Sequence, residues 1–484
     1  MFYRLSENYK LRGWEKATSV LIDSYNNYKE VAEREFSLLL LCDGEVDLDD
    51  LGLSQEDSAI LDRFLQTGIL ECSREPFPMR EEQKYLYHDN RFVRSVFWSI
   101  TGKCNYKCRH CYLNAPDAAL GELTTETALS LIDQMAECGV LQVDISGGEP
   151  LVRKDFWTLI EGLHDYGIRV GVLYTNGAVL NESILERFSE LGMDPQISIS
   201  FDGLGTHDWL RGVKGAEKAA LRALELCRNH GFTTDVEMCI HNGNKHTLRD
   251  TVNFLKGYGV SALKTAPVTE TELWRKHAEG NQISLREYFE TVISYIPDFY
   301  KDGMPMDITL SAVASMQGGS TEYSIVPEAL DPESGREECR NCYLCASARF
   351  NTYIAPDGRL LPCMPMAAYS EYSHFPKVQE IGLKRGLSDS YYMDFVSRRV
   401  CDLEERNTEC ASCPYLYRCG GGCRANALSI DEIEGHHSAI ADEMGFESRL
   451  MGRDPYQCIL FKEGYVDRIH ETFRKSIELY CSQE

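Results

Sequence analysis

Residues 101–113 read Thr-Gly-Lys-Cys-Asn-Tyr-Lys-Cys-Arg-His-Cys-Tyr-Leu, and this stretch carries three cysteines within eight positions. Cys104, Cys108 and Cys111 follow the spacing C-x3-C-x2-C. Three close thiolates suit three corners of a four-iron iron–sulfur cluster, and they leave one iron open to a small molecule. A zinc site is the alternative, since His110 could supply a fourth ligand. The rest of the chain favours the cluster.

Bulk composition narrows the class of protein. The chain has 484 residues, 19 cysteines and a net charge of −25. The amino terminus lacks the basic and apolar regions of a signal peptide, so we expect a cytoplasmic protein whose cysteines bind metal rather than form disulfides. The acidic charge argues against a nucleic-acid partner. No apolar run reaches the roughly 18 residues of a membrane span, so we expect no membrane association.

Apolar runs and amphipathic stretches alternate after residue 93. The predicted strands are 95–100, 142–146, 169–174, 195–201, 234–240 and 262–267. The predicted helices are 124–138, 156–166, 182–191, 216–230, 247–258 and 285–299. Six strand–helix units predict an α/β fold with a parallel sheet, and six are fewer than the eight of a closed barrel. We therefore expect a partial (β/α)6 barrel of the TIM type over 93–302, with ligands at the carboxyl ends of its strands.

Polar and glycine residues stand where these strands end. Gly147, Gly148, Glu149 and Pro150 follow the second strand, and glycines there let backbone approach a ligand closely. Three further strand-end groups are Asn176 after the third strand, Ser198 and Ser200 at the fourth, and then His207 and Arg211. Each group alone could be an ordinary turn. Together, on successive strands, they predict a binding site beside the cysteine stretch.

Residues 1–92 predict a separate small domain. We expect strands at 2–5, 10–14, 20–23 and 69–72, helices at 28–42 and 54–66, and a charged linker over 75–90. This order resembles a winged helix, but no basic helix is present for DNA. An open strand edge could instead accept an extended peptide as an added strand. A domain that serves only for packing is the alternative.

A second field of cysteines fills the carboxyl-terminal part. An irregular connector is predicted over 303–336, and ten cysteines follow between 339 and 458. Eight of them are enough for two four-iron clusters, with a pair of zinc ribbons as the alternative. We expect this iron–sulfur domain to span 303–465 with its connector, and a terminal helix to occupy 466–484.

Taken together, these motifs resemble the radical S-adenosylmethionine (radical SAM) enzymes that carry a C-terminal SPASM domain, over roughly 93–465. The resemblance implies that Cys104, Cys108 and Cys111 bind the catalytic [4Fe–4S] cluster, and that Gly147–Pro150 form the motif for the amino group of S-adenosylmethionine. It implies further cofactor contacts from His110, Asn176, Ser200 and Arg211. No side chain is assigned as a catalytic residue.

The same resemblance implies ligands for two auxiliary [4Fe–4S] clusters. The first would take Cys345, Cys363 and Cys423, with Cys339 as its fourth ligand and Cys342 as the competing choice. The second would take Cys410, Cys413, Cys419 and Cys458. The N-terminal domain resembles the recognition element of enzymes that mature ribosomally made peptides (RiPPs), which captures a precursor's leader.

The implied activity is peptide maturation through a 5′-deoxyadenosyl radical, in which the cofactors supply the radical chemistry. A thioether crosslink of the sactipeptide or ranthipeptide type is the preferred product, and a carbon–carbon or carbon–oxygen crosslink comes next. Formylglycine formation, as in anaerobic sulfatase maturation, is a further alternative, and an iron–sulfur electron carrier or sensor is the alternative of another class. The expected partners are a precursor peptide and an electron donor such as flavodoxin or ferredoxin.

Overall fold

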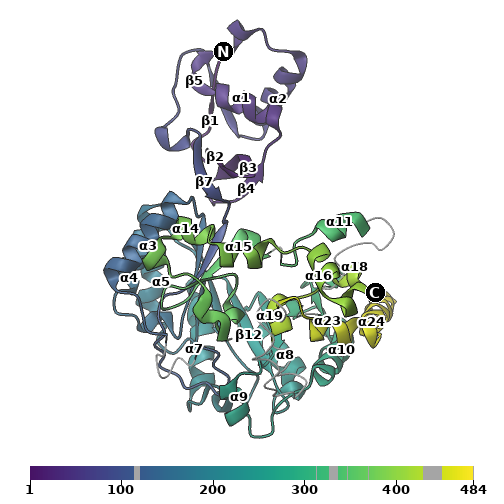
Figure 1. The fold of residues 1–484 in the computed structure, drawn as a ribbon. Helices are drawn as coiled ribbons and strands as arrows, with labels where there is room; N and C mark the ends of the chain where they lie inside the picture. Colours follow the sequence, from purple (N-terminus) through teal and green to yellow (C-terminus); the bar gives the residue numbers. More distant parts are fainter. Residues whose placement is uncertain are drawn as a thin grey trace.

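The computed structural model describes residues 1–113, 120–311, 313–325, 336–345, 347–368, 370–428 and 450–482. Figure 1 shows a small body in purple, which we call the N-terminal unit (residues 1–92), above a larger body that holds the rest of the chain. In the part of the chain described, no helix is both long and apolar enough to cross a membrane.

The larger body is built on one sheet of eleven strands, in the order β16-β15-β14-β13-β12-β11-β10-β9-β8-β17-β18. Its central strands are β8 (Ser95–Ser99), β9 (Gln142–Ser146), β10 (Arg169–Thr175), β11 (Gln196–Ser200), β12 (Thr234–Ile240) and β13 (Ala262–Pro267). All of these pair in parallel with their neighbours. The prediction of an α/β fold with a large parallel sheet is therefore confirmed.

The sheet extends beyond the six predicted strands at both edges. Strand β14 (Asp307–Leu310) pairs in parallel with β13, and β15 (Ala314–Met316) and β16 (Tyr323–Ile325) continue it. At the other edge, β17 (Asn351–Ile354) pairs in parallel with β8, and β18 (Leu360–Leu361) follows. The prediction of an irregular connector over 303–336 was wrong for β14, β15 and β16. Strands of three or four residues are too short to show a period in sequence.

Helices follow the strands and cover the outside of the sheet (Figure 1). They are α3 (Thr125–Glu137), α4 (Phe156–Asp165), α5 (Glu182–Glu190), α6 (His207–Arg211), α7 (Ala216–Asn229), α8 (Leu248–Lys256), α9 (Glu272–His277) and α10 (Leu285–Lys301). Side-chain caps start four of them, because Thr124, Asn181, Thr271 and Ser284 each accept a backbone N–H from the first turn. Except for the short α6 and α9, these helices match the predicted ranges closely.

The N-terminal unit contains two small sheets, ordered β5-β1-β6 and β4-β3-β2-β7. Their strands are β1 (Phe2–Leu5), β2 (Tyr9–Glu15), β3 (Ala17–Asp23), β4 (Tyr28–Glu30), β5 (Asp43–Asp47), β6 (Leu70–Ser73) and β7 (Leu86–Arg91), and its helices are α1 (Glu33–Leu41) and α2 (Gln55–Gln66). The predicted helix over 28–42 was wrong at its start. Pairing of β4 with β3 decides the conformation there, and neighbouring strands are invisible in a local pattern. The predicted linker over 75–90 was likewise wrong at its end, since β7 pairs with β2.

The N-terminal unit is fastened to the end of helix α3. The indole N–H of Trp14 donates to the carbonyl of Cys138 at 2.9 Å, and Nδ1 of His88 lies 2.8 Å from the carbonyl of Glu137. These side chains satisfy carbonyls that a helix end leaves without partners. Trp14 is fully buried and packs with Phe92 and Leu141 in an apolar cluster. The unit is therefore held by both polar and apolar contacts.

Short helices make up the carboxyl-terminal part. They are α11 (Arg336–Asn341), α12 (Ser347–Phe350), α13 (Val378–Ile381), α14 (Leu383–Leu387), α15 (Ser390–Ser397), α16 (Val400–Arg406), α17 (Thr408–Ala411), α18 (Leu416–Cys419), α19 (Arg424–Leu428), α23 (Pro455–Lys462) and the long α24 (Tyr465–Cys481). Helix α24 packs along α10, where the rings of Phe289 and Tyr465 lie 5.4 Å apart and Arg468 pairs with Glu290. This contact closes the chain back onto the sheet body.

Replacing Trp14 with alanine should loosen the N-terminal unit. Removal of a buried tryptophan from a packed cluster costs about 3–5 kcal/mol, and the carbonyl of Cys138 would also lose a donor. We expect faster amide hydrogen exchange in β2 and β3. Tyr25→Ala is the matched control, because Tyr25 is 70% exposed at the turn after β3. Equal exchange in wild type and Trp14→Ala would contradict this role for Trp14.

Candidate functional site

The first cysteine group lies on the loop that follows β8, at the carboxyl end of the parallel strands. Cys104, Cys108 and Cys111 are half-buried, and their thiols lie close enough to interact electrostatically. Burial raises the pKa of Cys104 to about 12 and also raises the pKa of Cys108. Buried thiols of this kind ionise when a metal supplies positive charge. The three thiols are therefore neutral until a metal cluster supplies that charge, and they have the donor type that such a cluster takes.

A glycine loop packs directly against the cysteine loop. The N–H of Gly148 donates to the carbonyl of Thr101 at 2.8 Å, and the N–H of Glu149 donates to the carbonyl of Lys103 at 2.9 Å. A Cβ on Gly148 would lie 2.2 Å from the oxygen of Lys103, and one on Gly147 would lie 2.6 Å from the oxygen of Thr101. Only glycine permits this approach of two backbones.

Glu149 joins the ends of two neighbouring strands. Its carboxylate is fully buried and accepts hydrogen bonds from the N–H of Leu151, the hydroxyl of Thr175 and the N–H of Asn176. Burial raises its pKa to about 7, although these three donors lower it. In this structure the side chain of Glu149 fixes the loop from within, and Pro150 opens the short turn that follows it.

Asn176 connects this loop to the cysteines. Its amide donates to the side-chain oxygen of Asn105 at 2.8 Å and lies 4.0 Å from the sulfur of Cys104. Asn105 itself was not predicted as a site residue. An asparagine between two metal ligands gives no periodic signal, so only its position beside Cys104 could have pointed to it.

Arg211 approaches the cysteines from helix α6. One guanidinium nitrogen lies 4.0 Å from the sulfur of Cys108, and the other two bind the carboxylate of Asp202 at 2.6 and 3.1 Å. Asp202 is fully buried. Burial opposes its ionisation, but Arg211 and His207 hold the pKa of Asp202 well below its usual range. Asp202 was not among the predicted site residues, because aspartate before glycine is common in turns.

The two remaining predicted cofactor contacts, His110 and Ser200, lie in different surroundings. Burial lowers the pKa of His110 to about 3, and the charges of Arg211 and Asp202 act on it. A neutral His110 ring is therefore favoured beside the cysteines. Ser200 is half-buried at the end of β11, in register with Glu237 of β12. The structure thus brings the predicted cysteines, glycine loop, Asn176, His110 and Arg211 to one place.

The interior of the sheet body is polar and aromatic. The ring of Phe97 on β8 lies 5.0 Å from that of Tyr174 on β10 and 5.7 Å from that of Tyr353 on β17. Strands β8 and β10 are not neighbours, so this contact shows that the sheet curves around these rings. Glu237 pairs with Lys264, and Asp235 accepts from Ser198 at 3.2 Å. Burial raises the pKa of Asp235 to about 6.

Four cysteines of the second field line one small cavity. Cys410, Cys413, Cys419 and Cys458 meet there. Burial raises the pKa of Cys410 to about 11 and that of Cys419 to about 12. The glycines at 420–422 all have positive φ, which lets the chain turn tightly after Cys419. This set has the number and type of donors that a four-iron cluster takes.

A further set, of three cysteines, lies beside the four cysteines that line this cavity. Cys345, Cys363 and Cys423 interact electrostatically, and burial raises the pKa of each. Cys339 is buried and donates to the carbonyl of Tyr417, with Cys342 as its neighbouring thiol. The exposed thiol of Cys342 donates to the carbonyl of Glu338. The choice between Cys339 and Cys342 as the fourth ligand stays a prediction.

Over the described residues, no three His, Cys, Asp or Glu side chains surround a position for a single metal ion. In a four-iron cluster each thiolate binds its own iron, so its ligands stand further apart than ligands of one ion.

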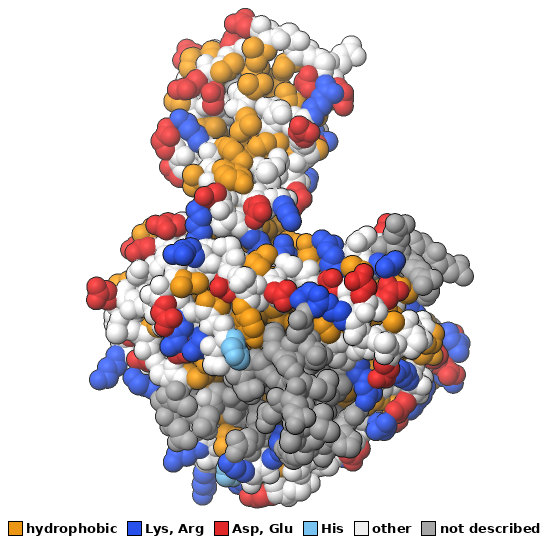
Figure 2. Space-filling view, viewed as in Figure 1, with side chains coloured by type: hydrophobic (Ala, Val, Ile, Leu, Met, Phe, Trp, Pro, Cys, Tyr) orange, Lys and Arg blue, Asp and Glu red, His pale blue; other side chains and the backbone are white. Residues whose placement is uncertain are grey.

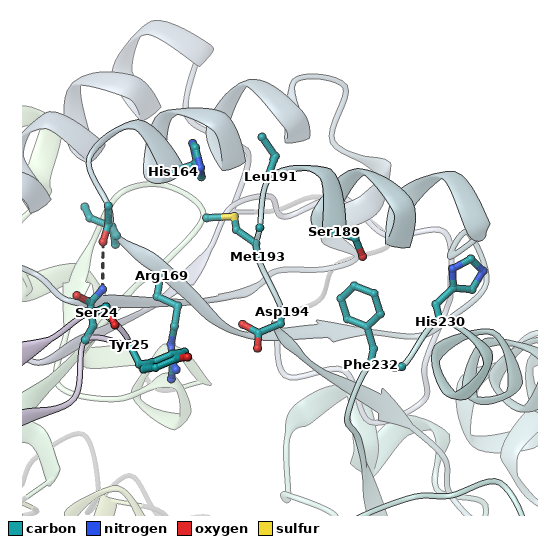
Figure 3. Close-up of a pocket in the computed structure, with 15 residues that line it drawn as sticks. Ser24, Tyr25, His164, Arg169, Ser189, Leu191, Met193, Asp194, His230 and Phe232 are labelled. Carbon is teal, nitrogen blue, oxygen red and sulfur yellow. Dashed lines mark hydrogen bonds between the residues drawn. The ribbon is translucent and has the colours of Figure 1, made fainter. Parts of the chain in front are cut away.

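A cavity of about 590 Å³ lies at the other end of the sheet body (Figure 3). Ser24 and Tyr25 of the N-terminal unit border it, together with Arg169, Asp194 and Phe232. These last three stand at the amino ends of β10, β11 and β12, whereas the cysteine loop follows the carboxyl end of β8. In barrels of parallel strands the chemistry takes place at the carboxyl end, so we do not assign this cavity to the reaction.

Comparison with known proteins finds one protein family that matches the central part of the chain. Residues 98–255 match the Radical SAM superfamily. The chain is 27% identical over 345 residues to an AdoMet-dependent heme synthase of Methanosarcina barkeri, covering 69% of this chain and 92% of that protein. It is 26% identical over 350 residues to the subtilosin biosynthesis protein AlbA of Bacillus subtilis, covering 69% and 68%. The crystal structure of Streptococcus suis SuiB bound to precursor peptide SuiA has the same fold, with a TM-score of 0.63 and 17% identity, over 88% of this chain and 97% of that one.

Substitution of Gly148 by alanine should abolish binding of S-adenosylmethionine while most of the iron stays bound. The added Cβ would collide with the carbonyl of Lys103 and force the glycine loop away from the cysteine loop. Equilibrium dialysis with labelled S-adenosylmethionine measures the loss, and iron analysis measures the clusters. Gly257→Ala is the matched control, since its Cβ would meet one atom at 3.3 Å at the end of α8. Unchanged binding in Gly148→Ala would contradict the role given to this contact.

Proposed function

The chain contains a radical SAM domain at residues 98–255, and we propose that it is a peptide maturase which crosslinks a ribosomally made precursor. Members of this superfamily bind S-adenosylmethionine and a [4Fe–4S] cluster. The observation that carries the proposal is the N-terminal unit, which adds an exposed strand edge and apolar surface to the radical SAM body.

The residues of the first cysteine group fit the cluster and cofactor of this superfamily. Cys104, Cys108 and Cys111 would hold three irons, and the contact of Gly148 with the cysteine loop would place backbone beside the fourth. When bound, the cluster and S-adenosylmethionine supply a 5′-deoxyadenosyl radical that removes a hydrogen from the substrate. Arg211 and Asn176 would orient the bound cofactor at the cysteines. The neutral ring of His110 would give the cofactor a flat surface for stacking.

A peptide would be captured on the N-terminal unit. Figure 2 shows hydrophobic side chains gathered on this unit. Strand β7 has one paired neighbour, β2, so no strand lies along its other edge among the described residues. The rings of Phe36 on α1 and Tyr85 before β7 touch at 5.3 Å. Leu40 lies one turn beyond Phe36, on the same face of α1. Tyr87 lies two residues beyond Tyr85, on the same face of β7. Both side chains are exposed, so they form an apolar surface next to the contact of these two rings. An extended leader could pair with β7 and place apolar side chains on α1.

The polar interior of the sheet body would receive the segment to be modified. Phe97, Tyr174 and Tyr353 provide flat surfaces for side chains, and Glu237 and Asp235 provide acceptors for backbone or side-chain N–H groups. Binding of the leader raises the effective concentration of this segment near the cysteine loop. The reach between the two sites is then set by the length of the precursor.

A thioether crosslink is the product that we propose. The two carboxyl-terminal cysteine sets would hold auxiliary [4Fe–4S] clusters, which could remove an electron from a product radical. The similarity to AlbA, a protein of subtilosin biosynthesis, supports a bacteriocin-type peptide as substrate. Carbon–carbon crosslinking and formylglycine formation use the same first step, so product analysis separates them. We divide the chain accordingly at residues 92, 302 and 465.

A heme precursor is the second candidate substrate, because the similarity to the AdoMet-dependent heme synthase covers 92% of that protein. That alignment spans 69% of the present chain, so about a third of the chain lies outside it. A small tetrapyrrole does not call for a surface outside the barrel. The N-terminal unit therefore favours the peptide.

The reconstituted protein should cleave S-adenosylmethionine and modify a peptide under anaerobic conditions with dithionite. We expect 5′-deoxyadenosine and a mass loss of about 2 Da per crosslink in the peptide encoded beside the gene, since two hydrogens leave as the bond forms. Mass spectrometry measures both products. A parallel reaction with a heme precursor tests the second candidate.

The matched control for this reaction is the triple variant Cys104→Ala/Cys108→Ala/Cys111→Ala. It should keep about two thirds of the iron, because two of three four-iron clusters remain, and should form no 5′-deoxyadenosine. Wild-type protein that forms no 5′-deoxyadenosine would refute the radical reaction. Cleavage with an unchanged peptide and a changed heme precursor would refute the peptide substrate.

Charges placed on the exposed surface of the N-terminal unit should weaken precursor binding. We expect Leu40→Glu/Tyr87→Glu to bind a labelled precursor at least about tenfold more weakly, equal to about 1.4 kcal/mol. Fluorescence anisotropy measures the affinity, and cleavage of S-adenosylmethionine without peptide should not change. Leu479→Glu is the control, because Leu479 is 63% exposed on α24, far along the chain from this unit. Equal affinity of the double variant and wild type would exclude this surface.

A further inference from the structure

One buried ion pair stands against the first cysteine group. Arg211 directs one guanidinium nitrogen toward the sulfur of Cys108 at 4.0 Å, and its other two nitrogens bind both carboxylate oxygens of Asp202. Asp202 is fully buried and Arg211 is 9% exposed. The pair is therefore a fixed dipole whose positive end faces the thiolate position.

Asp202 is held in place by groups other than Arg211. Its carboxylate also accepts the backbone N–H of Cys239 on β12 at 3.0 Å. Its own N–H donates to Nδ1 of His207, and its carbonyl accepts from the amide of Asn244 and the hydroxyl of Thr206. These contacts come from several elements, so the carboxylate has one position. The carboxylate of Asp202 therefore determines the position of the guanidinium of Arg211.

A charge in this position acts on the cluster more strongly than a surface charge would. Reduction adds one negative charge to a cluster, so a nearby cation favours the reduced form and a nearby anion disfavours it. Interactions between buried charges are weakly screened. Net charge and hydrogen bonds near the sulfurs are among the factors that set the potential of iron–sulfur clusters.

We propose that Asp202 is a positioning residue that holds the guanidinium of Arg211 against Cys108 and thereby sets the reduction potential of the cluster bound by Cys104, Cys108 and Cys111. The inference rests on the proposed function only in requiring that cluster. It concerns the electron that enters the cluster and is independent of the peptide or heme precursor that follows.

Two single variants of the pair should shift the potential in opposite directions. Arg211→Gln leaves the negative charge of Asp202 uncompensated near Cys108, so the midpoint potential should fall. Asp202→Asn leaves the positive charge of Arg211 uncompensated, so the potential should rise. In Asp202→Asn/Arg211→Gln both charges are gone, and the potential should lie between those of the two single variants. General damage to the site would not give opposite signs.

The measurement is a redox titration followed by electron paramagnetic resonance, on reconstituted full-length protein without S-adenosylmethionine or substrate. The spectrum of Cys104→Ala/Cys108→Ala/Cys111→Ala is subtracted, so that the signal of the first cluster remains. Arg249→Gln is the matched control, because Arg249 forms a similar two-point pair with Asp302 between the outer helices α8 and α10. Its potential should equal that of wild type.

The outcomes separate this proposal from the proposed function. Shifts of the same sign in both single variants, or no shift in either, would overturn the role of the pair. A wild-type protein without any signal after subtraction would instead refute the cluster itself. If Asp202→Asn does not fold, Arg211→Lys and Arg211→Gln still decide, since lysine keeps the charge and should keep the potential closer to wild type than glutamine does. A potential in Arg211→Lys as low as in Arg211→Gln would overturn the proposal.

Discussion

The site depends on two backbone hydrogen bonds, from Gly148 to Thr101 and from Glu149 to Lys103. They join the loop after β8 to the loop after β9 at a distance that only glycine allows. The buried carboxylate of Glu149 then ties both loops to the end of β10. Three strand ends are thus joined by hydrogen bonds within the chain. Binding positions that are already formed lose less free energy on ordering when the ligand arrives.

The second cysteine field is positioned by the same sheet. Strand β17 pairs with β8 in register, so that Tyr353 stands opposite Phe97, and the hydroxyl of Tyr353 donates to Ser99 at 2.9 Å. Strand β8 leads into the first cysteine loop, and β17 leads through β18 to Cys363. The distance between the two fields is therefore fixed by strand pairing and not by a flexible linker.

Sequence patterns predicted the parallel sheet and its main helices, because long alternating segments carry a clear period. They failed where pairing with a distant segment decides the structure, as for β4, β14 and β17. At the site, the cysteine spacing and Gly147–Pro150 were visible because their chemistry is rare. Asp202 and Asn105 were not, since aspartate and asparagine after a strand are common in turns. Their roles follow from burial and from which groups they contact.

A buried arginine accompanies each cysteine field, and the two are held in different ways. Arg211 is neutralised by direct pairing with Asp202. Arg424 lies 2% exposed beside Cys423 and Cys410, and carbonyls of Leu450, Gly452 and Gly421 bind its guanidinium. A buried carboxylate belongs to this second arrangement as well, because the charge of Asp454 acts on Arg424. Asp454 also accepts the backbone N–H of Cys423 at 2.7 Å. In the first field the carboxylate binds the guanidinium directly, and in the second it binds the backbone of a cysteine, so each arginine stands beside its cysteines together with a buried negative charge.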